Sequence, residues 1–269
     1  MLKRTISGVV AAVILIAILF MHTYVIRIAL TAILLLCMFE ALRCFGMEKK
    51  RFLVFTGVFA SVIMPFMDII GFNYIAPVFA ICLMLLSFSA IFGYKTVSVS
   101  DISSLSFLIL LIPFGLSHLI YIRALDMGVY YIWLPILGAF GADIGAYFIG
   151  CGVGGKKLCE ALSPKKTVAG SIGAFIGSVV AFVIYAIIIK LISDIQINYI
   201  LYFLVAIICG GISQIGDLTA SSLKRANNIK DFGKIMPGHG GMLDRVDSLC
   251  LISPFVYYVL TLIPYNIFY

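Results

Sequence analysis

Residues 169–192 read AGSIGAFIGSVVAFVIYAIIIKLI and contain one charged residue, Lys190. The hydrocarbon core of a bilayer is about 30 Å thick and takes about 20 apolar residues of helix to cross. This run is long enough for one such helix. Its apolar pattern is continuous, whereas the strands of a membrane β-barrel alternate apolar and polar residues. The run therefore predicts a membrane-spanning helix in which Gly173 and Gly177 mark a face packed closely against another helix.

Similar apolar runs fill most of the chain, separated by short stretches that are charged or contain Gly, Pro or Asn. Together with the run 169–192, the apolar runs in chain order cover residues 5–21, 25–39, 52–67, 72–92, 105–122, 129–149, 169–192, 199–218 and 249–268. The pattern predicts an all-α integral membrane protein with about nine transmembrane helices. Only a short segment around His22 divides the first two runs, so one long helix is the alternative there.

The composition excludes several classes of protein. Hydrophobic residues make up 63% of the 269 positions and charged residues 12%, and the mean hydropathy is +1.16. An ordinary soluble domain has about 25% charged residues. A soluble enzyme, a disordered regulator and a secreted disulfide scaffold are therefore excluded. The net charge of +7 is typical of a membrane protein with basic cytoplasmic loops, so we expect no nucleic-acid partner.

The basic residues also predict the orientation. If nine helices alternate in direction, every Lys and Arg except Arg27, Arg123 and Lys190 falls on the side of the N-terminus. Basic residues are retained on the cytoplasmic side. We therefore expect a cytoplasmic N-terminus, a C-terminus outside, and a multi-pass protein of the cell (inner or plasma) membrane with its active site facing the cytoplasm.

Charged residues concentrate in the second half of the chain, between Asp143 and Asp247. We predict N-terminal scaffold helices over residues 1–128 and a catalytic region over 129–269. The catalytic region should contain cytoplasmic loops at 150–168 and 219–248.

The first polar candidates lie at the cytoplasmic ends of the sixth and seventh runs. Asp143 interrupts an apolar run, where a carboxylate costs about 2.5–3.5 kcal/mol and marks a functional hypothesis. The alternative is a residue near the helix end that reaches water. Lys165 and Lys166 precede a helix that Thr167 can cap, and the free N–H groups there favour phosphate. A basic loop flank is the alternative for the two lysines.

Polar residues of the eighth run recur at spacings of three and four, so they share one helical face. They are Ser213, Gln214, Asp217 and Ser221. A wet stripe on an apolar helix is typical of a helix that lines a cavity.

The last cytoplasmic loop carries the densest polar cluster. Asp244 and Asp247 are spaced to share a helical face, and oxygen ligands of this kind favour Mg²⁺ together with substrate phosphates. Arg245 suits phosphate oxygens, and Gly240 and Gly241 allow backbone N–H groups to approach a ligand. These residues point to a Mg²⁺-dependent enzyme that joins a phosphorylated soluble substrate to a lipid phosphate.

This loop resembles the signature of the phosphatidate cytidylyltransferase (CDP-diacylglycerol synthase) family. The family pattern is filled here by Ser221, Lys224, Arg225, Lys230, Asp231, His239, Gly240, Gly241, Asp244, Arg245 and Asp247. Further matches are GADIGAYF at 141–148, SPKKT at 163–167 and GDL at 216–218. The chain departs from the family at Val168-Ala169-Gly170, where Trp-Glu-Gly is usual and a carboxylate is therefore missing.

The resemblance implies that CTP and phosphatidate react to give CDP-diacylglycerol and pyrophosphate for phospholipid biosynthesis. It implies Mg²⁺ as the cofactor and allows a second cation such as K⁺. The implied metal ligands are Asp217, Asp244 and Asp247, and the other residues with a direct role in the reaction are Lys224, Arg225 and Arg245. The implied substrate-binding residues are Asp143, Ser163, Lys165, Lys166, Thr167, Lys230, Asp231, His239, Gly240 and Gly241.

Two other functions remain open from the sequence. A related CTP-dependent lipid-alcohol kinase would transfer the γ-phosphoryl group, although the fuller signature favours the cytidylyltransferase. An ion-coupled transporter would use intramembrane aspartates, but internal repeats are typical of that class and this chain has no clear repeat.

We expect membrane lipids as partners, and the resemblance allows a homodimer.

Overall fold

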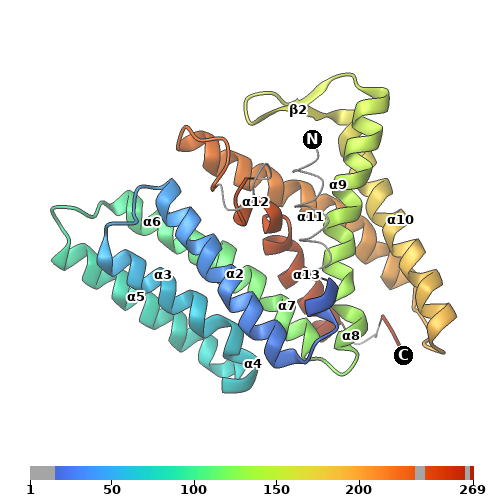
Figure 1. The fold of residues 1–269 in the computed structure, drawn as a ribbon, viewed down its shortest axis with the longest axis horizontal. Helices are drawn as coiled ribbons and strands as arrows, with labels where there is room; N and C mark the ends of the chain where they lie inside the picture. Colours follow the sequence, from blue (N-terminus) through green and yellow to red (C-terminus); the bar gives the residue numbers. More distant parts are fainter. Residues whose placement is uncertain (1–15, 234–239, 264–266) are drawn as a thin grey trace. The chain divides into compact units, whose positions relative to one another are not determined.

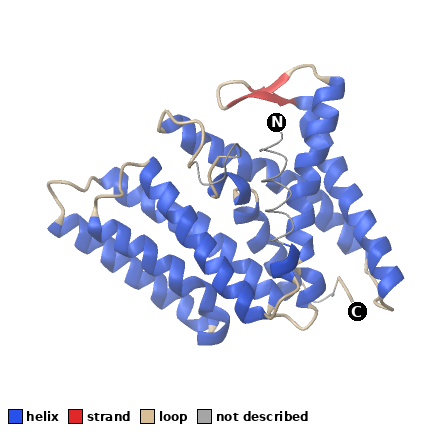
Figure 2. Ribbon diagram, viewed as in Figure 1, coloured by secondary structure: helices blue, strands red, loops and turns tan. Residues whose placement is uncertain are grey.

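Helices dominate the computed structural model, which describes residues 16–233, 240–263 and 267–269 (Figure 2). Within these residues, eight helical segments are long and apolar enough to cross a membrane. They are Thr23–Cys44, Arg51–Ile70, Phe72–Phe92, Val99–Arg123, Gly128–Val153, Val168–Ile192, Tyr199–Ala226 and Leu243–Leu262. The predicted all-α membrane fold is confirmed. Most of the apolar run 5–21 lies outside the described residues, so a ninth span stays a prediction.

The second apolar run begins a helix of its own. Helix α2 (Thr23–Cys44) starts after a turn at Phe20 and a bend at Met21. His22 is its N-cap residue, and its Nδ1 accepts from the backbone N–H of Tyr24 at 3.4 Å. The chain is therefore interrupted between the first two runs, as separate helices require.

The chain forms two compact units. The first consists of Met1–Ala124 and Ala226–Val246, and the second of Leu125–Arg225 and Asp247–Tyr269. The segment that follows helix α11 thus packs with residues 1–124, although it lies in the sequence between two parts of the second unit.

The first unit is a set of packed helices in which α3 lies between α2 and α5 (Figure 1). Pro113 lies inside the π-helical turn η3, so α6, η3 and α7 form one irregular span. In chain order after α2, the elements are α3 (Arg51–Ile63), η1 (Met64–Phe66), α4 (Met67–Ile70), η2 (Phe72–Tyr74), α5 (Ile75–Phe92), α6 (Val99–Ile109), η3 (Leu110–Phe114), α7 (Gly115–Arg123) and α12 (Leu243–Val246).

Two ion pairs connect loops and helix ends within the first unit. Arg27 donates from both terminal nitrogens to the carboxylate of Asp68, at 2.5 and 2.7 Å, which is the bidentate geometry that Arg favours. Lys50 Nζ lies 2.6 Å from Asp101 Oδ2, and Asp101 also closes a capping box with Ser98 at the start of α6. Each pair joins segments that are distant in the sequence.

The second unit contains α8 (Gly128–Tyr131), α9 (Trp133–Val153), β1 (Lys157–Cys159), β2 (Ser163–Thr167), α10 (Val168–Ile192), α11 (Tyr199–Ala226) and α13 (Leu249–Leu262). Helices α9 and α10 lie side by side (Figure 1). Their contact is a glycine seam: a Cβ on Gly145 would lie 2.7 Å from Gly177 Cα, and one on Gly141 would lie 2.8 Å from Gly177 O. The close packing predicted for Gly173 and Gly177 is confirmed.

The segment between α9 and α10 is not simply a loop, because β1 and β2 pair antiparallel there (Figure 2). Lys157 pairs with Thr167 and Cys159 with Ser163. Gly154 and Gly155 adopt positive φ angles of 63° and 92°, which glycine adopts at little steric cost. These glycines turn the chain out of α9 and into the hairpin.

Two helix ends also differ from the sequence prediction. Helix α11 continues to Ala226, so Lys224 and Arg225 lie on its last turn rather than in the loop predicted for 219–248. Basic residues are favourable there because they face the negative end of the helix dipole. Helix α13 ends at Leu262, before the end of the apolar run 249–268.

We predict that Gly145→Leu destabilises the protein by about 1–3 kcal/mol or more, because a large side chain would force α9 and α10 apart. Gly152→Leu is the matched control on the same helix, since a Cβ at Gly152 meets no atom within 4 Å. Thermal unfolding of both variants in detergent measures the difference. Equal stability of the two variants would contradict the glycine seam.

Candidate active site

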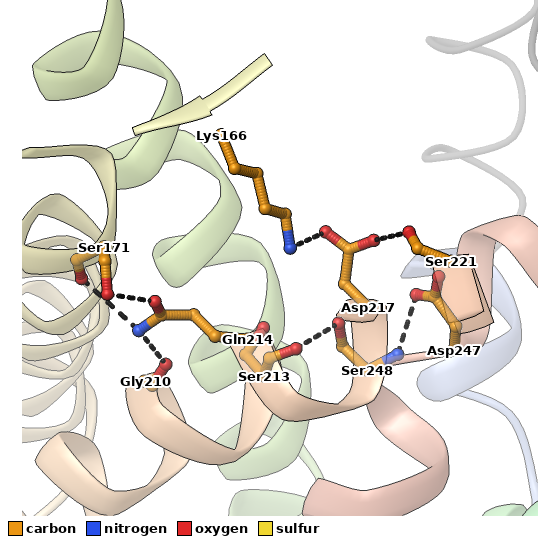
Figure 3. Close-up of polar contacts among 9 residues, drawn as sticks. All are labelled: Lys166, Ser171, Gly210, Ser213, Gln214, Asp217, Ser221, Asp247 and Ser248. Carbon is orange, nitrogen blue, oxygen red and sulfur yellow. Dashed lines mark hydrogen bonds and ion pairs between the residues drawn. The ribbon is translucent and has the colours of Figure 1, made fainter. Parts of the chain in front are cut away.

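Part of the polar stripe on α11 holds this helix against α10 (Figure 3). Ser171 Oγ donates to Gln214 Oε1 at 2.5 Å, and Gln214 Nε2 donates to Ser171 O at 3.3 Å and to Gly210 O at 3.1 Å. Ser213 is buried, and its carbonyl accepts from Ser248 Oγ at 3.1 Å. The prediction that the whole stripe lines a cavity is wrong for Ser213, and Gln214 is half-buried and bonded to α10. A helix without water around it uses such side chains to bond its neighbours.

Farther along α11, Asp217 receives two polar contacts (Figure 3). Lys166 Nζ from strand β2 lies 2.5 Å from Asp217 Oδ2, and Ser221 Oγ donates to Asp217 Oδ1 at 3.5 Å. The side chains of Lys166 and Asp217 are 25% and 34% exposed, so this carboxylate is open to a ligand. The hairpin therefore brings a predicted phosphate-binding lysine to a predicted metal ligand.

Asp247 is held beside α11 by a close backbone approach. A Cβ on Gly216 would lie 2.8 Å from Ser248 Cα and 3.0 Å from Asp247 O. Ser248 N–H donates to Asp247 Oδ1 at 2.7 Å, which orients the carboxylate at the start of α13. Since Gly216 directly precedes Asp217, the same contact places both aspartates at one point of the second unit.

The charges of this unit act on one another. The Asp247 carboxylate interacts electrostatically with the carboxylates of Asp217 and Asp143 and with the ammonium group of Lys224. Asp143 lies on α9 and is exposed. Like charges that are close together repel, and a cation relieves that repulsion. The structure thus gathers residues from α9, β2, α11 and the turn before α13 that are far apart in the sequence.

The remaining candidates of the second unit lie on or against the hairpin. Thr167 is the N-cap of α10 and accepts from Gly170 N–H at 3.0 Å, which confirms the predicted helix start. Ser163 begins β2, and Lys165 is exposed on it. Arg225 Nε donates to the carbonyl of Leu162, in the hairpin turn, at 3.3 Å. The last turn of α11 is therefore tied to the hairpin.

The candidates from the signature loop belong to the first unit. Asp244 Oδ2 accepts from the backbone N–H groups of Phe232 at 2.9 Å and Gly241 at 3.0 Å. Gly240 has a φ of +85°, and a Cβ there would lie 3.0 Å from Asp244 Oδ2 and 3.4 Å from Asp231 Oδ1. The glycine therefore permits this tight turn, and Asp244 organises the loop around it.

Three further residues of the signature complete this description. Lys230 and Arg245 are exposed, and Arg245 lies on the short helix α12. His239 lies outside the described residues. Asp244 and Asp247 are joined through the chain, although one belongs to each unit. Among the residues that the structure describes, no three His, Cys, Asp or Glu side chains are grouped closely enough to hold a metal ion by themselves.

Sequence reasoning missed Glu40, a buried carboxylate near the end of α2. It accepts from the backbone N–H groups of Met242 at 3.1 Å and Leu243 at 3.0 Å, within the first unit. In the sequence it merely ends the apolar run 25–39. The available signal was a lone carboxylate between the apolar run and the apolar pair Ala41-Leu42, because a carboxylate that is buried in such a place needs hydrogen-bonding partners.

Comparison with known proteins places the chain among related sequences. Residues 2–263 match the profile of the cytidylyltransferase family. The phosphatidate cytidylyltransferase of Bacillus subtilis (strain 168) is 30% identical over 272 residues, which cover 97% of this chain and 98% of the relative. That of Rickettsia bellii (strain RML369-C) is 29% identical over 214 residues, or 79% of this chain and 93% of the relative. That of Staphylococcus haemolyticus (strain JCSC1435) is 37% identical over 140 residues, or 52% of each chain.

We predict that Gly216→Ala lowers stability by about 1–3 kcal/mol, because the added methyl group overlaps the backbone at Ser248. Gly211→Ala is the matched control on α11, since its Cβ would meet only the ring of Phe175, at 3.3 Å. Thermal unfolding in detergent compares the two. A Gly216→Ala protein as stable as Gly211→Ala would contradict the close approach of α11 to the start of α13.

Proposed function

The chain belongs to the cytidylyltransferase family, and we infer that it transfers the cytidylyl group of CTP to phosphatidate. The products are CDP-diacylglycerol and pyrophosphate. A phosphate oxygen of phosphatidate attacks the α-phosphorus of CTP, and the bond from that phosphorus to the bridging oxygen of the β-phosphate breaks. The observation that carries this inference is that Asp217 on α11 lies close to Asp247 and is paired with Lys166 of strand β2, within a unit that is otherwise largely apolar.

The chemistry asks mainly for positioning and for neutralisation of charge. A phosphate monoester is already anionic at neutral pH, so it can attack without a strong general base. Both substrates are anions, and bringing them together requires positive charge in a fixed place. We assign this task to Lys166, Lys224, Arg225 and Arg245. Arg225 and Arg245 can each grip a phosphate through two N–H groups.

We propose Mg²⁺ as the cofactor, held by Asp217, Asp247 and Asp244. Carboxylate oxygens are hard ligands, and Mg²⁺ uses one or two of them together with substrate phosphates, so a complete protein cage is not required. Asp217 and Asp247 repel each other, although Lys166 pairs with Asp217 and Lys224 interacts with Asp247. Two carboxylates this close support a cation here. When bound, Mg²⁺ would neutralise charge on the triphosphate oxygens.

We propose that this site faces the cytoplasm from a cell membrane. The distribution of basic residues places the loops around Lys50 and Asp101 on the cytoplasmic side, and these two residues form an ion pair. It places Arg27 and Asp68 on the other side, and these also pair with each other. Pairing within each predicted side supports the alternation of the helices, and the excess of basic residues on one side supports the orientation. This orientation would give CTP direct access from the cytosol.

We expect the purified protein, with Mg²⁺, CTP and phosphatidate in detergent micelles, to form CDP-diacylglycerol and pyrophosphate. CTP labelled separately at the α- and γ-phosphates follows the transferred group. The α-label should enter the lipid and the γ-label should leave as pyrophosphate. Transfer of the γ-label to a lipid alcohol, with release of CDP, would identify a kinase and overturn the proposal.

We expect Asp247→Asn and Asp244→Asn each to lower kcat by about 100-fold or more, because each removes a proposed ligand of the Mg²⁺ that offsets the negative charge of the transition state. Both variants should also need more Mg²⁺ for half-maximal rate. Asp194→Asn is the control, since Asp194 is an exposed residue of the second unit between α10 and α11. A wild-type Mg²⁺ dependence in either variant would remove that aspartate from the metal site.

A further inference from the structure

Glu40 is a buried acidic residue in the part of the chain that the sequence assigns to scaffold. It lies near the end of α2, and only 3% of its surface is exposed. Burial of a carboxylate is costly unless hydrogen bonds replace its water. The groups that form hydrogen bonds with Glu40 therefore indicate what this residue does.

Those partners are backbone groups of the signature loop. Glu40 Oε1 accepts from Met242 N–H at 3.1 Å, and Oε2 accepts from Leu243 N–H at 3.0 Å. Each carboxylate oxygen thus takes one of two successive amides, immediately before Asp244 and Arg245. Two parallel hydrogen bonds fix the orientation of the loop backbone as well as its distance from the Glu40 carboxylate.

Two glycines allow the carboxylate to come this close. A Cβ on Gly241 would lie 2.5 Å from Oε2 and 2.7 Å from Oε1 of Glu40, and a Cβ on Gly233 would overlap the same carboxylate. Any other residue at either position would push the loop away from α2. The signature glycine Gly241 therefore serves the approach of Glu40 to the loop.

A second carboxylate holds the same loop from within. Asp244 Oδ2 accepts from Phe232 N–H and Gly241 N–H, and the side chains of Phe232 and Leu243 are 4% and 1% exposed. The apolar side chains can keep the loop docked, whereas the carboxylates select its backbone conformation. Loss of the Glu40 bonds should therefore loosen the loop without unfolding the unit.

We propose that Glu40 is a positioning residue for the nucleotide end of the reaction. It acts through the amides of Met242 and Leu243 and holds the turn that presents Asp244 and Arg245 to the metal ion and the phosphates of CTP. This assignment rests on the function proposed above. It predicts a defect in the use of CTP and Mg²⁺ rather than in the use of phosphatidate.

The test uses Glu40→Gln, which keeps the length of the side chain but replaces one acceptor oxygen by an NH₂ group that cannot accept from an amide. Glu40→Asp keeps the carboxylate but withdraws it by about 1.5 Å, the length of one C–C bond. Glu48→Gln is the matched control, because Glu48 is an exposed carboxylate shortly after the same helix.

Hydrogen–deuterium exchange of the peptides that cover Met242 and Leu243 reads the contact directly and does not depend on turnover. We expect exchange there to rise about tenfold or more in Glu40→Gln and Glu40→Asp, with the control unchanged. Steady-state kinetics should show kcat/KM for CTP lowered by about 10- to 100-fold, with the KM for phosphatidate unchanged. Glu40→Asp should not restore activity, because reach rather than charge is needed.

Each outcome decides a separate claim. Unchanged exchange in both variants would overturn the contact. Faster exchange with wild-type CTP kinetics, or an equal loss for both substrates with unchanged KM values, would overturn the positioning role and leave a structural one. A wild-type protein that makes no CDP-diacylglycerol would overturn the proposed function, while the exchange measurement would still report on Glu40.

Discussion

A backbone amide or a charged side chain that is shielded from water must find its hydrogen-bonding partner inside the protein, and this constraint organises the molecule. Helices satisfy the amides of the membrane spans internally. Where the chain leaves helical geometry, side chains take over, as Glu40 does for Met242 and Leu243. Helix α11 bonds α10 through Gln214 and Ser171 in the same way. Polar residues such as Glu40, Ser171 and Gln214 therefore stabilise the fold through hydrogen bonds, whether or not they contact a substrate.

The positions of the proposed active-site residues follow from the same packing contacts. Asp217 and Asp247 are brought together because Gly216 lets the start of α13 approach the backbone of α11, and Lys166 reaches Asp217 because a short hairpin turns β2 toward it. Asp244 bonds two amides of its own loop while remaining a proposed metal ligand. A site of this kind is suited to the binding of anions, since fixed charges cost little reorganisation during the reaction.

How much the sequence predicted depended on whether a feature is local. Thr167 was predicted as a helix cap because capping involves neighbouring residues, and it caps α10. The glycine seam was predicted from spacings of four residues and joins α9 to α10. The hairpin was missed because its two strands are short, and the cavity-lining stripe was wrong because periodicity shows which residues share a face but not what that face meets. Glu40 was missed because its partners lie about two hundred positions away in the chain.

The sequence by itself determined the all-α membrane class, the positions of most spans and the family, because apolar length, composition and a dense signature are properties of the linear chain. Only the tertiary structure decided that the signature loop belongs with the first unit and that Glu40 holds it. It alone paired Lys166 with Asp217 and placed Asp247 within reach of the charges of Asp217 and Asp143. A sequence pattern shows that a buried polar residue or a glycine face needs a partner. Only the packed structure shows which distant segment is that partner, because a contact forms only where two backbones can approach each other.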